Sequence, residues 1–157
     1  MLDGVRQRYE SAGGGGFLFS PDGSRTAYAA KVQDKELIIL DGKEGEPYDN
    51  ISKGTLVFSS DSKRLAYGVG IGVKWAAVAD GVRHREYDEI AAITFLGGRM
   101  VYAAQADGKW SVVVDESEGN RYEGIVTGSI FLDSVDHLRY LAMKEGKILS
   151  VNETLQE

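Results

Sequence analysis

Cysteine is absent from this 157-residue sequence, which excludes disulfide bonds, thiolate metal ligands and a cysteine nucleophile. Proline and histidine occur only twice each, so few imidazoles are present to act as general bases or metal ligands. No apolar run approaches the about 20 residues of a membrane-spanning helix, and residues 1–6 lack the apolar stretch of a signal peptide. We therefore expect a soluble, cytoplasmic protein with no membrane association, held together by packing and strand pairing.

Basic residues are also in the minority, with 18 Lys and Arg against 24 Asp and Glu, a net charge of -6 and a pI near 5.0. Such a balance repels phosphate backbones, so nucleic acid is not an expected partner. The hydrophobic fraction of 43% and charged fraction of 27% are typical of globular proteins. The length suits one domain over residues 1–157.

The feature that dominates the sequence is an internal repeat. Residues 19–28 recur at 58–67, at 95–102 in shortened form, and at 131–140, each time ending in a tyrosine. These tyrosines are Tyr28, Tyr67, Tyr102 and Tyr140. Seven residues after each comes a lysine, and thirteen after each comes an acid; the lysines are Lys35, Lys74, Lys109 and Lys147, and the acids Asp41, Asp80, Asp115 and Glu153. A second tyrosine series, Tyr48, Tyr87 and Tyr122, is followed each time by Asp or Glu. Every unit is therefore predicted to be the same supersecondary element.

Within a unit the pattern is that of strands and turns. Apolar or β-forming runs at 56–58, 64–67, 75–79 and 86–90 predict four short strands. Turn residues at 20–23, 41–42, 80–81 and 97–98 separate them, and the glycine-rich stretches 13–16 and 68–72 are interpreted as loops. The predicted fold is all-β: a β-propeller of four four-stranded antiparallel blades, with repeats at 17–54, 55–91, 92–127, and 128–157 plus 1–12.

The chain begins and ends within a repeat, so the last blade lacks its outer strand. Residues 5–9 resemble an outer strand and are predicted to complete the last blade. Three arrangements stay open: a ring closed within one monomer, a strand-exchanged homodimer that forms a larger ring, and a segment of a longer propeller.

The stretch Phe-Ser-Pro-Asp-Gly-Ser-Arg-Thr-Ala-Tyr at 19–28, echoed at 58–67, resembles the WD40-like (PD40-like) repeat of TolB-type propellers. The same repeat is found in the propeller domains of prolyl oligopeptidase relatives. The resemblance implies a platform that binds proteins, peptides or small ligands through one face and its central channel. Relatives of this kind usually have six or more blades, and this chain has four.

The repeated lysines are the sharpest candidates for ligand binding. In a ring, Lys35, Lys74, Lys109 and Lys147 would form a circle of charge at the channel mouth, able to hold an anion or an acidic peptide. The alternative is that they remain solvated beside hairpin turns. Trp75 and Trp110 follow two of these lysines, and are either packing between blades or exposed stacking surfaces on one rim. The tyrosines of both series are interpreted as structural.

Signals of catalysis are weak. The sequence has no paired-histidine metal motif, no Gly-x-Ser-x-Gly elbow and no phosphate-binding glycine loop, so we assign no catalytic residue, metal site or cofactor. His84 lies in the basic run Arg83-His84-Arg85, interpreted as a solvated turn. The hypothesis is a non-catalytic binding or scaffold module for a protein, peptide or small ligand. The alternatives are a glycoside- or phosphate-active propeller enzyme using channel carboxylates, and a half-ring that dimerises.

Overall fold

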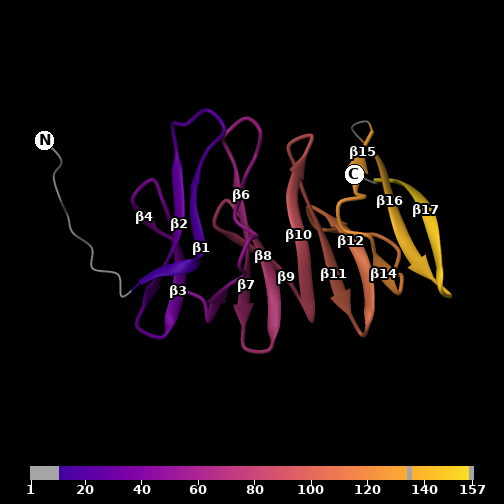
Figure 1. Cartoon of the computed structure of the whole chain (residues 1–157), viewed down its shortest axis with the longest axis horizontal. Helices are drawn as coiled ribbons and strands as arrows, with labels where there is room; N and C mark the ends of the chain where they lie inside the picture. Colours follow the sequence, from indigo (N-terminus) through magenta and orange to yellow (C-terminus); the bar gives the residue numbers. More distant parts are fainter. Residues whose placement is uncertain (1–10, 134–135, 156–157) are drawn as a thin grey trace, which may run out of the picture.

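The computed structural model describes residues 11–133 and 136–155, with side chains described from Phe17 onward. This part of the chain consists of β-strands joined by turns, in four antiparallel sheets that follow one another along the sequence. We call them sheet 1 (β1–β4), sheet 2 (β5–β9), sheet 3 (β10–β13) and sheet 4 (β14–β17). Figure 1 shows them side by side in a row, with sheet 1 at the indigo end and sheet 4 at the yellow end. The prediction of an all-β chain with four repeated sheets is confirmed.

Sheets 1 and 3 are simple meanders in which each strand pairs with the next. Sheet 1 consists of β1 (Ser11–Phe19), β2 (Thr26–Val32), β3 (Lys35–Leu40) and β4 (Lys43–Glu44). Sheet 3 consists of β10 (Glu89–Leu96), β11 (Arg99–Ala106), β12 (Lys109–Val114) and β13 (Ser117–Glu118).

Sheets 2 and 4 follow the same plan, but their first strand is broken into two short pieces that both pair with the second strand. Sheet 2 consists of β5 (Asn50–Ile51), β6 (Val57–Phe58), β7 (Leu65–Ile71), β8 (Lys74–Ala79) and β9 (Val82–Tyr87). Sheet 4 consists of β14 (Gly124–Ile125), β15 (Phe131–Leu132), β16 (His137–Lys144) and β17 (Lys147–Thr154). Gly54 and Gly128, both with positive φ, lie at the breaks. In β10 a single register shift, with Ala92 at φ 56°, takes the place of the break.

The tight turns agree with the sequence interpretation. Asp41-Gly42, Asp80-Gly81 and Gly97-Gly98 are two-residue hairpin turns, flanked by the pairs Leu40 with Lys43, Ala79 with Val82, and Leu96 with Arg99. Both central residues of each turn have positive φ, as a type I′ turn requires. The three turn predictions are confirmed.

Both glycine-rich stretches, by contrast, were wrongly interpreted as loops. Gly68 and Gly70 lie inside β7, and residues 13–16 lie inside β1, where the pairing register shifts. A Cβ on Gly68 would lie 3.0 Å from Cδ1 of Ile90, and one on Gly70 would lie 3.3 Å from a ring carbon of Trp75. These two glycines therefore leave room for side chains that pack on the strand.

The core fills the spaces between neighbouring sheets. Each repeated tyrosine from the second unit on lies against small or branched residues of the preceding sheet: Tyr67 packs with Ala27, Ala29 and Ile38, Tyr102 with Ala66, Ala77 and Ala79, and Tyr140 with Val101, Val112 and Val114. A smaller cluster on the other face of sheet 1 contains Ala30, Leu37 and Ile39, packed against Tyr28 and Val32. One large aromatic against several small residues gives the close packing of a protein interior.

Sheet 4 has no strand beyond β17 among the described residues, so it lacks a counterpart of β4, β9 and β13. The interrupted last repeat predicts this missing outer strand. Residues 5–9, predicted to fill that place, lie outside the described residues. In the described row, sheets 1 and 4 lie at opposite ends, and closure into a ring is not observed. The sheets begin at Ser11, Asn50, Glu89 and Gly124, a few residues before the predicted repeat boundaries.

Candidate binding surface at the turn rim

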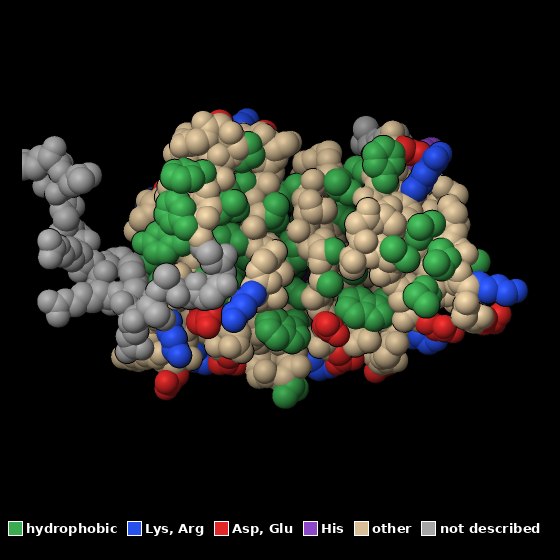
Figure 2. Space-filling view, viewed as in Figure 1, with side chains coloured by type: hydrophobic (Ala, Val, Ile, Leu, Met, Phe, Trp, Pro, Cys, Tyr) green, Lys and Arg blue, Asp and Glu red, His purple; other side chains and the backbone are tan. Residues whose placement is uncertain are grey.

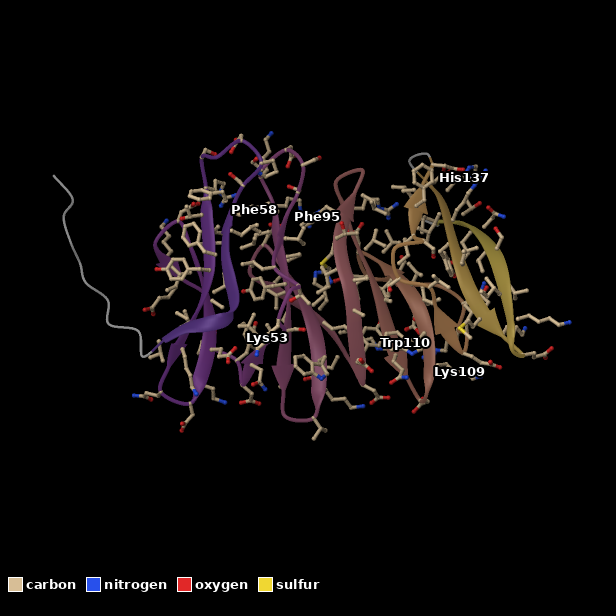
Figure 3. All side chains as sticks on the ribbon, viewed as in Figure 1. Lys53, Phe58, Phe95, Lys109, Trp110 and His137 are labelled. Carbon is tan, nitrogen blue, oxygen red and sulfur yellow. The ribbon has the colours of Figure 1, made fainter. Side chains whose placement is uncertain are left out.

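The hairpin turns between the second and third strand of each sheet lie at one edge of the row, the lower edge in Figure 1. We call this edge the turn rim and define it as residues 33–35, 72–75, 107–110 and 145–147. Each turn has a residue with positive φ five positions after the repeated tyrosine, and a lysine opens the third strand. Figure 3 shows Lys109 and Trp110 toward this edge. The structure therefore places the four predicted lysines at equivalent positions along one edge.

Lys35 and Lys74 are each tied to the sheet that follows. The Lys35 ammonium donates to the Asp49 carboxylate, which also accepts the Gly72 N–H of sheet 2 at 2.7 Å. In the same way the Lys74 ammonium donates to Asp88, which accepts the Asp107 N–H of sheet 3 at 3.0 Å. An acid between two sheets thus holds a lysine on one side and a turn on the other.

These contacts favour the ionised form of both aspartates. The hydrogen bond from Lys35 holds the pKa of Asp49 below its usual value, and the bond from Lys74 does the same to the pKa of Asp88. The Asp88 carboxylate in turn raises the pKa of Lys74. At neutral pH the charges of Lys35 and Lys74 are therefore largely neutralised locally.

The contacts of the rim lysines differ at sheets 3 and 4. Glu123 stands where Asp49 and Asp88 stand earlier, and it accepts the N–H of Glu145 at 3.0 Å. Lys109 and Lys147 are nevertheless exposed, and neither forms an ion pair within the part of the chain that the structure describes. A glutamate is one carbon longer than an aspartate, and its carboxylate reaches the turn without meeting the lysine. Two cations are thus left at this end of the rim.

Trp75 and Trp110 follow Lys74 and Lys109 directly and are both half-buried. Trp75 packs against the cluster between sheets 2 and 3 and lies across the strands from Gly70 and Tyr87. Trp110 lies across from Gln105 and bridges to Tyr122. Trp75 therefore contributes to packing between sheets, and both tryptophans keep part of their surface accessible at the rim.

The opposite edge carries arginines whose contacts between sheets the sequence analysis did not identify. Arg25 pairs with Asp41 at 2.9 Å, donates to the carbonyl oxygens of Ser62 and Lys63 in sheet 2, and lies over the ring of Phe58. Arg64 repeats the arrangement with Asp80, the carbonyl oxygen of Gly98 and Phe95. Figure 3 shows Phe58 and Phe95 toward this upper edge. The fixed spacing of arginine, tyrosine and acid was visible in the sequence, but the partner in the next sheet was not.

The two tyrosine series meet between sheets. Tyr87 packs edge-to-face on Tyr102, and Tyr122 does the same on Tyr140, with ring centroids 6.2 and 6.1 Å apart. The Tyr140 hydroxyl donates to Glu153 at 2.8 Å, and burial raises the pKa of Tyr140 above its usual value. Burial likewise raises the pKa of Tyr67 to about 12. These contacts are those of structural side chains.

A polar groove of about 640 Å³ lies between sheets 3 and 4, lined by Glu118, Asn120, Asn152 and Glu153 among others. The two carboxylates are already engaged: Glu153 accepts from Tyr140 and Asn120, and Glu118 accepts from Arg85 and Arg121. Because these hydrogen bonds occupy both carboxylates, we interpret the two glutamates as structural residues and not as groups that transfer protons.

Neither histidine of the chain is among the residues that line this groove. The prediction that His84 lies at a turn is wrong, because this residue lies on β9. Its Nδ1 is buried 4.0 Å from the Glu116 carboxylate. His137 opens β16, with its Nδ1 3.7 Å from Asp133. No cluster of three His, Asp or Glu residues able to hold a metal ion occurs within residues 11–133 and 136–155. The same residues contain no helix of the length and hydrophobicity needed to cross a membrane.

Comparison with known proteins adds no assignment, because no protein-family model matches the chain and no curated protein matches it.

Proposed function

We propose that the chain is a non-catalytic binding module of the propeller type, and that its turn rim binds an acidic segment of a partner protein or peptide. The observation that carries the proposal is the pair of exposed lysines, Lys109 and Lys147, that lack an ion-pair partner among the described residues. The half-buried Trp110 follows Lys109 directly in the chain. A partly accessible aromatic ring next to a free cation suits a carboxylate-rich peptide with an apolar side chain.

The repeat architecture supports this assignment. Four sheets of one design, stacked in sequence order, bring equivalent residues to one edge, where loops and turns are free to vary without cost to the core. The WD40-like resemblance of residues 19–28 and 58–67 supports interpreting the sheets as propeller blades and the turn rim as one face of the propeller. In that arrangement an extended ligand would contact turns from neighbouring sheets.

The net charge of -6 limits which residues can attract an acidic ligand. An acidic partner is repelled by the molecule as a whole, so binding depends on the few cations that are free locally. Lys35 and Lys74 contribute less, because Asp49 and Asp88 already neutralise them.

The test is a titration with a glutamate-rich peptide that contains one leucine, followed by the fluorescence of Trp75 and Trp110. Replacing both Lys109 and Lys147 with alanine is expected to weaken binding about 2- to 30-fold, since each exposed ion pair contributes about 0.2–1 kcal/mol. The matched control is the double variant Lys35→Ala and Lys74→Ala, in which binding is expected to change less. A wild-type chain that does not bind the peptide, or equal weakening in both variants, would overturn the proposal.

A further inference from the structure

The outer edge of sheet 4 is β17, which has no further strand beside it in the part of the chain that the structure describes. Each of the other sheets has a strand beyond its third one, β4, β9 or β13, whereas β17 pairs only with β16 among the described residues. β17 is eight residues long. A free edge of this length presents a row of unpaired backbone N–H and C=O groups, which is the usual template for an added strand.

The outer face of sheet 4 is also uncovered. In sheets 1 to 3 the face turned toward the following sheet contains cross-strand pairs that are buried, such as Ala29 with Ile38, Ala66 with Ala79, and Val101 with Val114. The equivalent pairs of sheet 4 are Arg139 with Asn152, Leu141 with Ser150, and Met143 with Ile148. Leu141, Met143, Ile148 and Phe131 are exposed, Ile148 by 65%. Figure 2 shows the hydrophobic side chains on the surface at this end of the molecule.

Sheet 1 carries the matching feature at the other end of the row. Phe19 occupies the position of Phe58 and Phe95, as its pairing with Thr26 corresponds to that of Phe58 with Leu65 and Phe95 with Met100. Phe58 is only 7% exposed because sheet 1 and Arg25 cover it, whereas Phe19 is 60% exposed. Phe17 packs on Phe19 edge-to-face and is also exposed.

Residues 5–9 are too close to β1 in the sequence to span from sheet 1 to the β17 of the same chain in this arrangement. Packed sheets lie about 10 Å apart, so sheets 1 and 4 of the row are separated by about 30 Å. Only one residue separates position 9 from the start of β1 at Ser11, and an extended chain covers only about 3.5 Å per residue. A strand formed by residues 5–9 can therefore be added only to a β17 whose sheet 4 is stacked next to the sheet 1 that this segment precedes.

We propose that the outer face and edge of sheet 4 bind sheet 1 of a second copy of this chain, with residues 5–9 of that copy added to β17. The contact repeats the three interfaces already present within one chain, so sheet 4 of one copy meets sheet 1 of the next in the usual order. When both ends are used between two copies, the row closes into a ring of eight sheets.

Arg139 supplies the specific contact at this interface. At its position the earlier sheets carry Ala27 and Ala66, which lie in the same buried clusters as Phe58 and Phe95 of the following sheets. Arg139 of one copy therefore lies against Phe19 of the other, a cation over an aromatic ring like Arg64 over Phe95. Its present partner, Asp133 at 2.8 Å, holds the guanidinium on this side of the sheet.

The test uses the absence of cysteine from the natural chain. The single variants Phe19→Cys and Arg139→Cys are mixed and treated with a mild oxidant such as copper phenanthroline. A covalent dimer of twice 17.1 kDa is expected from the mixture and little from either variant alone, since a head-to-tail contact brings unlike positions together. Val73→Cys, at an exposed turn, replaces Phe19→Cys in the matched control and is expected to give no such dimer.

Light scattering of the unaltered chain provides a second measurement that does not depend on a variant folding. We expect twice the monomer mass for the whole chain, and the monomer mass after removal of residues 1–10. A monomer at every concentration, with no cross-link in the mixture and an intrachain disulfide in the double variant, would show that the ring closes within one chain and would overturn the proposal. Peptide binding at the turn rim is scored separately, so either proposal can fail without the other.

Discussion

Asp61 shows how one side chain organises the turn between the first and second strands. Its carboxylate accepts the Ser59 hydroxyl at 2.6 Å and the Lys63 N–H at 3.0 Å, while the Ser59 oxygen accepts the Arg64 N–H at 2.9 Å. Asp22 makes the same contacts with Ser20 and Ser24 in sheet 1. The hydrogen bond from Ser59 holds the pKa of Asp61 below its usual value. The sequence motif predicted a turn here, and the structure adds which groups the acid satisfies.

This contact predicts a pH dependence for the Asp61→Asn variant. Because the pKa of Asp61 is lower in the folded chain than in the unfolded one, folding favours the ionised form, and the stabilisation is fully present above the unfolded pKa of about 3.9. It is lost as the pH falls below that value toward the lower folded pKa. Urea unfolding at a series of pH values should show the variant less stable than the wild type at pH 7, with the difference shrinking in acid. A difference that stays constant from pH 7 to pH 2 would contradict this, and Asp34→Asn, at an exposed turn, is the control.

At the scale of strands and sheets, the arginine at the start of the second strand acts between elements. Arg64 joins its own third-strand turn, through Asp80, to the turn of the next sheet, through Gly98, and covers Phe95. In sheet 4 the equivalent residue is His137, and the acid Glu153 contacts Tyr140 instead. An imidazole is too short to span to a neighbouring turn, so the arrangement changes where the row of sheets ends.

Replacing Arg64 with alanine is therefore expected to destabilise the fold by about 1–3 kcal/mol, since a charge-assisted hydrogen bond and a cation–π contact are lost together. The control is Arg83→Ala, which removes an exposed arginine of β9 without an ion pair among the described residues and is expected to change stability by less than about 0.5 kcal/mol. Chemical denaturation of both variants measures the difference. Equal stability of the two variants would show that Arg64 does not stabilise the contact between sheets 2 and 3.

The elements that sequence patterns predicted well are those with local signals. Asp-Gly and Gly-Gly pairs require positive φ, and they formed the expected hairpin turns. Gly68 and Gly70 also predicted a loop, but they lie within a strand. The absence of a side chain at these two positions leaves room for the side chains of Ile90 and Trp75. The fourth repeat shows a related difference. Leu132, not Phe131, pairs with Leu138 and takes the place of Phe58, since the turn that follows it is one residue shorter.

At the scale of the whole molecule, the structure is a stack in which each sheet packs on its neighbours in sequence. Periodicity therefore predicted the repeating unit and the alignment of the lysines along one edge. It did not predict which lysines are free, because Lys35 and Lys74 meet aspartates whereas Lys109 faces the longer Glu123. It also did not determine how the two ends of the row are covered, since that depends on contacts beyond any single unit.

The measurement that tests this stacking most directly is the pattern of nuclear Overhauser effects from phenylalanine rings in an isotope-labelled chain. Stacked sheets are expected to give contacts from the Phe58 ring to the methyl groups of Ala27 and Ala29, and from the Phe95 ring to Ala66. Rings that show contacts only within their own sheet, or to sheets not adjacent in sequence, would contradict the stack of repeated sheets on which the turn rim depends.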